Sequence, residues 1–143
     1  MSLPPAVSEI AAAAVEVART QGDTACAALV GSWAAGRAGP TSDIDLILLT
    51  EQPQHLLNAD HWFGSFGDGA TLVRRGDFGA VQERRLQLPD GVVVEVNVGH
   101  LSWASTAPVD AGTRRVVKGG MLPLLDPESR LSDLLRSVGT TGG

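Results

Sequence analysis

Residues 31–49 read GSWAAGRAGPTSDIDLILL, and this stretch decides the fold. Its first half is rich in glycine and other turn-forming residues, which predict a tight turn and a short helix. Its end, residues 44–49, is an apolar run of the length expected for a buried strand. A similar apolar run, TACAALV, precedes it at residues 24–30. The sequence therefore predicts two buried strands joined by a turn and a short helix.

The rest of the chain continues with strand and helix patterns. Helices are predicted at 8–21, with Ser8 as N-cap and Gly22 as the stop, and at 54–68, 110–118 and 127–138, the last with Pro127 in its first turn. Strands are predicted at 70–75, 80–88 and 92–98, with a hairpin turn at 89–91, and 121–125 is a short apolar run. Residues 139–143 (GTTGG) are expected to be unstructured. We expect an α+β fold, a mixed β-sheet with helices packed on it, in a single domain (1–143) with its ordered core at about 8–138.

The composition is that of one folded domain. Of the 143 residues, 43% are hydrophobic and 19% are charged, a combination that disordered chains do not show. The net charge of -5 has the wrong sign for a protein that holds long nucleic acid through phosphate contacts. The single cysteine, Cys26, lies in an apolar run and is expected to be a reduced core residue. Because neither a signal-peptide pattern nor a membrane-length apolar stretch is present, we expect a cytoplasmic protein without membrane contacts.

The glycine-containing segment after the first strand approaches two known phosphate-binding motifs but matches neither. Arg37 stands where a P-loop has its lysine, and Ala38 stands where that motif has the hydroxyl that holds Mg²⁺. Ala34 interrupts the alternative dinucleotide-binding pattern. The sequence therefore favours neither a P-loop nor a Rossmann-type site.

Two aspartates at the start of the second strand carry more information. In a strand, alternate side chains share a face, so Asp43 and Asp45 project together from backbone positions about 6.5 Å apart. Two carboxylates on one face repel each other unless a cation neutralises them, and Mg²⁺ prefers carboxylate and phosphate oxygens. The alternative is that one or both aspartates cap a turn at the edge of the strand.

A third acid supports the metal interpretation. Glu95 lies in VVVEVNV, where a charged side chain among valines is costly unless it is paired or binds a metal. The alternative is an edge strand whose Glu95 faces solvent and pairs with Arg84 or Arg85 across the hairpin. Two aspartates on one strand and a glutamate on its neighbour would suit a two-ion site for phosphoryl transfer.

These residues resemble a known family. Gly31-Ser32, followed after ten residues by Asp43-Ile44-Asp45 and later by an acid with apolar neighbours, is similar to the motif of the polymerase-β-like nucleotidyltransferase superfamily. The fuller string GSWAAGRAGPTSDIDLILL resembles its bacterial single-domain and antibiotic-modifying branches, and the resemblance extends over about residues 8–137. It implies a Mg²⁺-dependent enzyme that transfers a nucleoside monophosphate from an NTP, expected to be ATP, to a hydroxyl acceptor and releases pyrophosphate.

The resemblance also assigns roles to individual residues. Gly31 and Ser32 would hold the triphosphate, with support from Arg37 and Ser42. Asp43 and Asp45 would bind two Mg²⁺ ions. Glu95 would bind the catalytic ion and help to deprotonate the acceptor.

The acceptor is expected to be a small molecule or a protein. Antibiotic-modifying members usually carry a further helical domain that builds the acceptor pocket, and 143 residues leave no room for one. We therefore expect a second copy of the chain or a partner protein to complete the cleft, through the apolar candidates Trp62, Phe63 and Trp103. Two further features are expected to be structural: His100 at a strand end, and a solvated helix face that carries the remaining basic cluster, Arg114, Arg115 and Lys118.

Two other classes of function compete with this enzyme. One is a non-catalytic, antitoxin-like interaction module that has kept the fold, although such a module gains nothing from a cluster of repelling carboxylates. The other is an RNA-modifying transferase, against which the negative net charge argues. The sequence favours the enzyme that acts on a small-molecule or protein hydroxyl.

Overall fold

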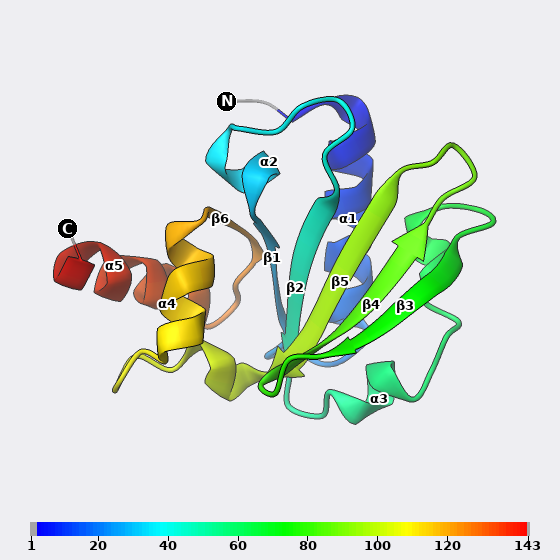
Figure 1. Cartoon of the computed structure of the whole chain (residues 1–143). Coiled ribbons are helices and arrows are strands. Elements are labelled where there is room, and N and C mark those ends of the chain that lie inside the picture. Colours follow the sequence, from blue (N-terminus) through cyan, green and yellow to red (C-terminus); the bar gives the residue numbers. More distant parts are fainter. Residues whose placement is uncertain (1–2, 143) are drawn as a thin grey trace.

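The structure is a computed structural model that describes residues 3–142. Six strands form one mixed sheet in the order β3-β4-β5-β2-β1-β6, in which only the central pair β2–β5 is parallel (Figure 1). The strands are β1 (Cys26–Val30), β2 (Ile44–Thr50), β3 (Thr71–Asp77), β4 (Val81–Gln87), β5 (Val93–His100) and β6 (Met121–Leu125). The helices are α1 (Pro5–Arg19), α2 (Ser32–Ala35), α3 (Gln54–Leu57), α4 (Ala111–Lys118) and α5 (Arg130–Gly142), with short 3₁₀ turns at Phe63–Phe66 and Leu101–Ala104. The predicted α+β fold is confirmed.

Side-chain alternation along the central strands creates two cores, one on each face of the sheet. On β2, for example, Leu46 and Leu48 pack in the core beneath α1, whereas Ile47 and Leu49 pack in the core that α5 and the end of α4 cover. The first core lies under the whole central sheet, but the second lies mainly over β1 and β2, on the β6 side (Figure 1). The second face of β5 and β4 is therefore left without a helical cover.

Several predicted elements are placed correctly. The turn 89–91 joins β4 and β5 in an antiparallel hairpin, and the apolar run 121–125 is the edge strand β6. Cys26 is buried in the second core. Burial, with the nearby charge of Asp126, raises the pKa of the Cys26 thiol to about 11, so this cysteine stays a protonated core side chain. In the described residues no helix is long and apolar enough to cross a membrane.

Other predicted boundaries are wrong. The first helix begins at Pro5 without a side-chain cap, so Ser8 is not its N-cap. The predicted helix 54–68 is instead the one-turn helix α3 and a 3₁₀ turn, because Asp60 and the glycines after it interrupt the apolar pattern. At the other end α5 continues to Gly142, so residues 139–142 are helical rather than unstructured, and Gly143 lies outside the described residues.

The last helix begins at Arg130, three residues later than predicted from Pro127, and Asp126 explains the difference. Its two carboxylate oxygens accept hydrogen bonds from the backbone N–H groups of Leu131 and Ser132, both at 2.9 Å, and from the Ser132 hydroxyl at 2.8 Å. These bonds satisfy N–H groups that have no partner within the first turn of a helix.

We expect Asp126→Ala to lower the free energy of unfolding by about 1 to 2 kcal/mol, because the first turn of α5 loses its cap. Urea unfolding monitored by circular dichroism measures the change. Asp126→Asn is the matched control, since an amide oxygen can still accept from the same N–H groups and should retain most of the stability. Equal losses in both variants would contradict the capping role.

Candidate active site

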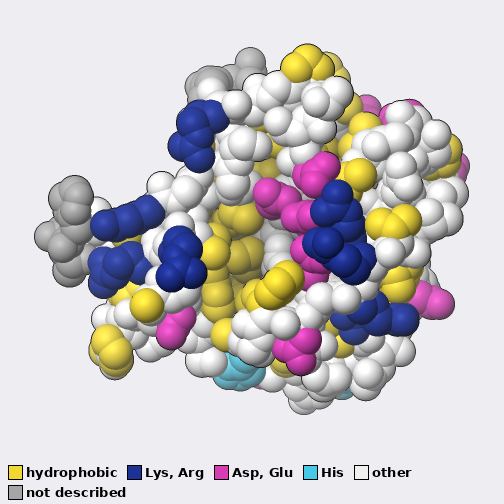
Figure 2. All heavy atoms as spheres, in the orientation of Figure 1, with side chains coloured by type: hydrophobic (Ala, Val, Ile, Leu, Met, Phe, Trp, Pro, Cys, Tyr) yellow, Lys and Arg dark blue, Asp and Glu magenta, His cyan; other side chains and the backbone are white. Residues whose placement is uncertain are grey.

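The three acids singled out by the sequence come together on the uncovered face of the sheet. Asp45 on β2 lies directly opposite Glu95 on β5 in the parallel pair, and Asp43 precedes β2 on the same side by strand alternation. Figure 2 shows acidic side chains gathered at the centre of this face, next to basic ones. The strands that carry Asp45 and Glu95 are neighbours, as expected, whereas Asp43 lies one residue before β2 rather than in the strand.

Three further charged residues lie on this face: Arg85, which the sequence offered only as a possible partner of Glu95, and Arg74 and Glu83, which it did not single out. Arg85 on β4 is paired in register with Glu95, and Arg74 on β3 is paired with Arg85. Glu83, two residues from Arg85 and therefore on the same face, is only 3% exposed. The pattern Glu83-x-Arg85 in a predicted strand indicates that both side chains share one face of the sheet. Only the β4–β5 register shows that this face also carries Glu95.

Arg85 is the main cation of the acid cluster. Its guanidinium donates to Glu95 and, at 3.1 Å, to Asp43. Arg74 donates to Glu83 at 2.9 Å and lies 3.8 Å from Glu95. The alternative interpretation of Glu95 is thus correct about Arg85 as a partner across the hairpin, but wrong about an edge strand, since β5 is central. Arg84 donates to the Leu57 carbonyl, away from Glu95.

Asp45 is the acid without an arginine partner among the described residues, and one of its oxygens, Oδ1, is buried without a hydrogen bond there. Burial, together with a hydrogen bond to Glu95 and the negative charges of Glu95, Asp43 and Glu83, raises the pKa of Asp45 to about 7. Asp45 therefore loses its proton only at a cost, which a bound cation would remove.

Gly31 places the backbone directly against Asp45. Its φ of +76° is in the left-handed region that glycine adopts without strain, and a Cβ there would lie 2.7 Å from Asp45 Oδ2. A side chain at position 31 would therefore displace the carboxylate. The glycine brings the start of α2 next to the acid cluster.

The other residues predicted to bind nucleotide lie around this point, but not all face the acids. Ser32 is the first residue of α2 and follows Gly31. Arg37 donates at 3.2 Å to the carbonyl of Gly119, the residue after α4. The Ser42 hydroxyl accepts from the Gly39 N–H at 2.9 Å and closes the loop before Asp43.

A cavity of about 370 Å³ adjoins the acids. Asp45, Glu83 and Glu95 line one side of it, and α4 borders the other, where Arg115 and Val116 contribute. A larger hollow of about 580 Å³ lies between the start of α1, the loop before β2 and the turn between β4 and β5, and its lining includes none of these acids. We therefore treat the smaller cavity as part of the site.

The expectation that three exposed aromatic residues meet a second chain is wrong. Trp62, Phe63 and Trp103 are buried, at 8% exposure or less, and the first two pack edge to face in the core under α1. They cannot form an exposed contact surface. His100 is structural, as expected: its Nδ1 accepts from the Ser102 N–H at 3.0 Å at the start of the 3₁₀ turn that follows β5.

The donor atoms at this site suit a hard divalent cation. In the part of the chain that the structure describes, no three acidic, histidine or cysteine side chains already surround a common point. Arg85 instead lies between Asp43 and Glu95 and neutralises part of their charge. The partnerless Asp45 Oδ1, with carboxylates on either side, is nevertheless the oxygen-rich environment that Mg²⁺ prefers.

The sequence was compared with models of known protein families. The sequence model of the family described as "Nucleotidyltransferase domain" matches residues 13–102, which is more than half of the chain. The same sequence has no match among curated proteins. The matched range runs from α1 to the 3₁₀ turn after β5 and so includes Gly31, Asp43, Asp45 and Glu95. Because the family match covers the acids and the sheet that brings them together, the chain belongs to the nucleotidyltransferase family of polymerase-β-like proteins.

Proposed function

We propose that this protein is a Mg²⁺-dependent nucleotidyltransferase that transfers NMP from an NTP, with ATP as the expected donor, to a hydroxyl group of a small molecule or a protein. The proposal rests on the pairing of Asp45 with Glu95 on adjacent central strands, with Asp43 beside them. Asp45 Oδ1 is buried and has no hydrogen-bond partner among the described residues. A module that only binds a partner has no need for such a destabilised carboxylate.

The reaction proceeds by direct displacement at the α-phosphorus. The acceptor oxygen forms a bond to that phosphorus, the bond to the bridging oxygen of the β-phosphate breaks, and pyrophosphate leaves with the electron pair. The proton of the acceptor hydroxyl passes to a carboxylate, and Glu95 is the residue that we assign to this role. Its pairing with Arg85 fixes the position of that carboxylate.

The remaining residues bind and orient the donor. Asp43, Asp45 and Glu95 would hold the Mg²⁺ ions, which supply positive charge to the phosphates when bound. Gly31 lets the backbone approach the acids closely, and its own N–H donates to the Gly120 carbonyl at 3.0 Å, which fixes the turn. We propose that Gly31 and Ser32 form the turn that holds the triphosphate, with Arg37 and Ser42 in support. Each of the motif residues Gly31, Ser32, Asp43 and Asp45 thus has a role in the proposed site.

The direct test is the transfer reaction itself. The protein is incubated with Mg²⁺, each of the four α-³²P-labelled NTPs in turn, and a lysate that supplies acceptors. Labelled product that requires both Mg²⁺ and this protein supports the proposal, and mass spectrometry then identifies the acceptor. Absence of product with all NTPs and several lysates, from a folded protein, would favour the non-catalytic module instead.

Ser32→Ala is expected to weaken binding of ATP in the presence of Mg²⁺ by about 1.5 kcal/mol, or roughly tenfold, because a hydrogen bond to a charged phosphate is lost. The stability should change little, since no hydrogen bond of the Ser32 hydroxyl is found in residues 3–142. Isothermal titration measures the affinity. An unchanged affinity would mean that Ser32 only connects β1 to the turn that follows it.

A further inference from the structure

The cavity beside the acids has features that the transfer reaction alone does not explain. It extends from Gly31 and Asp45 along the sheet to the tip of the β3–β4 hairpin and across to α4. We propose that this cavity binds the nucleobase of the NTP, with the ring of Phe78 against the face of the base. The inference rests on the proposed function, because it assumes that the phosphates lie at Gly31 and the acids.

Phe78 is the clearest of these features. Its side chain is 62% exposed and lines the cavity, so the ring is accessible to a ligand in it. Its N–H donates at 3.0 Å to the Val81 carbonyl, and the Gly79 N–H donates to Asp77, so the hairpin turn holds it in place. The ring lies over Gly76, where a Cβ would come within 3.1 Å of it.

The position of the ring relates it to the acid cluster. Gly76 lies opposite Glu83 in the β3–β4 register, so Phe78 lies on the face of the sheet that carries the acids. Apolar residues continue this surface across the floor of the cavity, with Ile47 and Val81 on the sheet. A flat apolar wall with one exposed aromatic ring suits the face of a purine or pyrimidine, whose stacking on an aromatic side chain is favourable.

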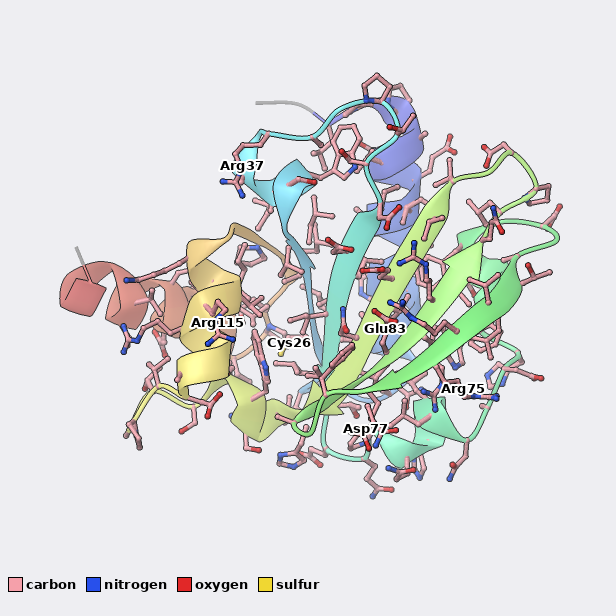
Figure 3. All side chains as sticks on the ribbon, in the orientation of Figure 1. Cys26, Arg37, Arg75, Asp77, Glu83 and Arg115 are labelled. Atoms are coloured by element: carbon pink, nitrogen blue, oxygen red, sulfur yellow. The ribbon has the colours of Figure 1, made fainter. Side chains whose placement is uncertain are left out.

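The edges of the cavity carry polar atoms for which the described residues supply no partner. Asn97 donates from its Nδ2 to the Leu46 carbonyl at 3.2 Å, and no hydrogen bond to its Oδ1 is found among the described residues. Arg115 enters the lining from α4, on the other side of the cavity from Glu83 (Figure 3), and makes no ion pair within residues 3–142. An acceptor oxygen and guanidinium donors suit the amino groups and ring nitrogens of a base. The sequence predicted that Arg115 only faces solvent. In the structure it also lines the cavity.

The volume of the cavity and its extension to Gly31 favour a nucleobase over a macromolecule as the ligand. The cavity volume of about 370 Å³ is at the lower end of the range for small-molecule pockets. It is too small to hold a segment of another protein. The same cavity reaches Gly31, so a nucleotide with its phosphates there can place its base inside without leaving the cavity. Figure 2 shows the apolar hollow between the acidic side chains and the basic side chains of α4.

The test compares ATP with inorganic tripolyphosphate, which has the phosphates but no base. Each ligand is titrated by calorimetry, with Mg²⁺ and without an acceptor, into the full chain and its variants. We expect Phe78→Ala to weaken ATP binding about tenfold and to leave tripolyphosphate binding unchanged, because stacking on the base is lost. Phe78→Trp should restore ATP binding. Val73→Ala is the matched control, since Val73 is similarly exposed on β3 and is not part of the lining.

The other outcomes overturn the inference in distinguishable ways. Unchanged ATP affinity in Phe78→Ala would show that Phe78 does not contact the base, and the acceptor would then be the remaining ligand for the cavity. Equal weakening of ATP and tripolyphosphate would mean that Phe78 acts on the phosphate site and not on the base. If the unaltered protein binds neither ligand, the proposed nucleotidyltransferase site fails and the base pocket fails with it. If it binds tripolyphosphate as tightly as ATP, only the base pocket fails.

Discussion

Asp45→Asn is expected to lower the rate of nucleotide transfer by more than about 100-fold, because loss of even an indirect metal contact typically costs 10- to 100-fold. In EDTA the same variant should be more stable than the unaltered protein. Asn keeps the shape of Asp45 but removes a charge that is partly buried among Glu95, Asp43 and Glu83. Transfer assays and thermal melts of the same preparation measure the two effects.

The gain in stability depends on pH in a defined direction. The pKa of Asp45 is about 7 in the folded protein and lies near 4 in an unfolded chain, so the folded state binds the proton more tightly. Ionised Asp45 therefore costs stability as the pH rises from about 4 to 7. The advantage of Asp45→Asn should be absent below about pH 4 and approach about 4 kcal/mol at pH 8, since each pKa unit corresponds to about 1.4 kcal/mol.

Two comparisons separate the metal role from a structural one. Glu95→Gln should also abolish transfer, but it should lower stability in EDTA, because Glu95 forms ion pairs with Arg85 and Arg74. Asp23→Asn, in an exposed turn before β1, is the control that should change neither property. If Asp45→Asn instead destabilises the protein at pH 8, Asp45 has a structural role and the proposed cation site is wrong.

The parts of the site that the sequence predicted are those that local rules determine. The two-residue spacing of Asp43 and Asp45 fixes a common face wherever that strand lies, and a glutamate among valines indicates a special environment for Glu95. That these two strands are neighbours was a hypothesis from the chemistry of the three acids, which the family resemblance then supported. Their register, which puts Asp45 opposite Glu95, depends on long-range pairing that a single sequence does not reveal.

The parts that were missed depend on register and on tertiary contacts. Glu83 was missed, and Arg85 could not be separated from Arg84 as the partner of Glu95, because only the pairing of β4 with β5 shows which side chains of β4 face the acids. Trp62 and Trp103 were expected to be exposed, but packing against the sheet buries both, and a single sequence does not show such tertiary contacts. Helix ends were misplaced where tertiary capping, as at Asp126, overrides local preference.

Arg85→Gln is expected to lower the free energy of unfolding in EDTA by about 2 kcal/mol, because removal of one partner leaves Asp43 and Glu95 without their main counter-charge. This figure is below the value for a fully buried pair, since Arg85 keeps some contact with solvent. Addition of Mg²⁺ should then stabilise Arg85→Gln more than it stabilises the unaltered protein. The reason is that the guanidinium and the cation neutralise the same carboxylates, so the ion binds more tightly once the arginine is gone.

Thermal melts at increasing Mg²⁺ concentration, with Ca²⁺ and K⁺ in parallel, measure this competition. Arg75→Gln is the matched control, because Arg75 is exposed on β3, next to Arg74 but on the other face of the strand, and should show the Mg²⁺ response of the unaltered protein. Equal Mg²⁺ responses in Arg85→Gln and the unaltered protein would show that the ion does not bind where Arg85 lies. A larger response in Arg85→Gln that is removed again by adding Asp45→Asn would place the ion between Asp43, Asp45 and Glu95, since the two substitutions can couple only through that cluster.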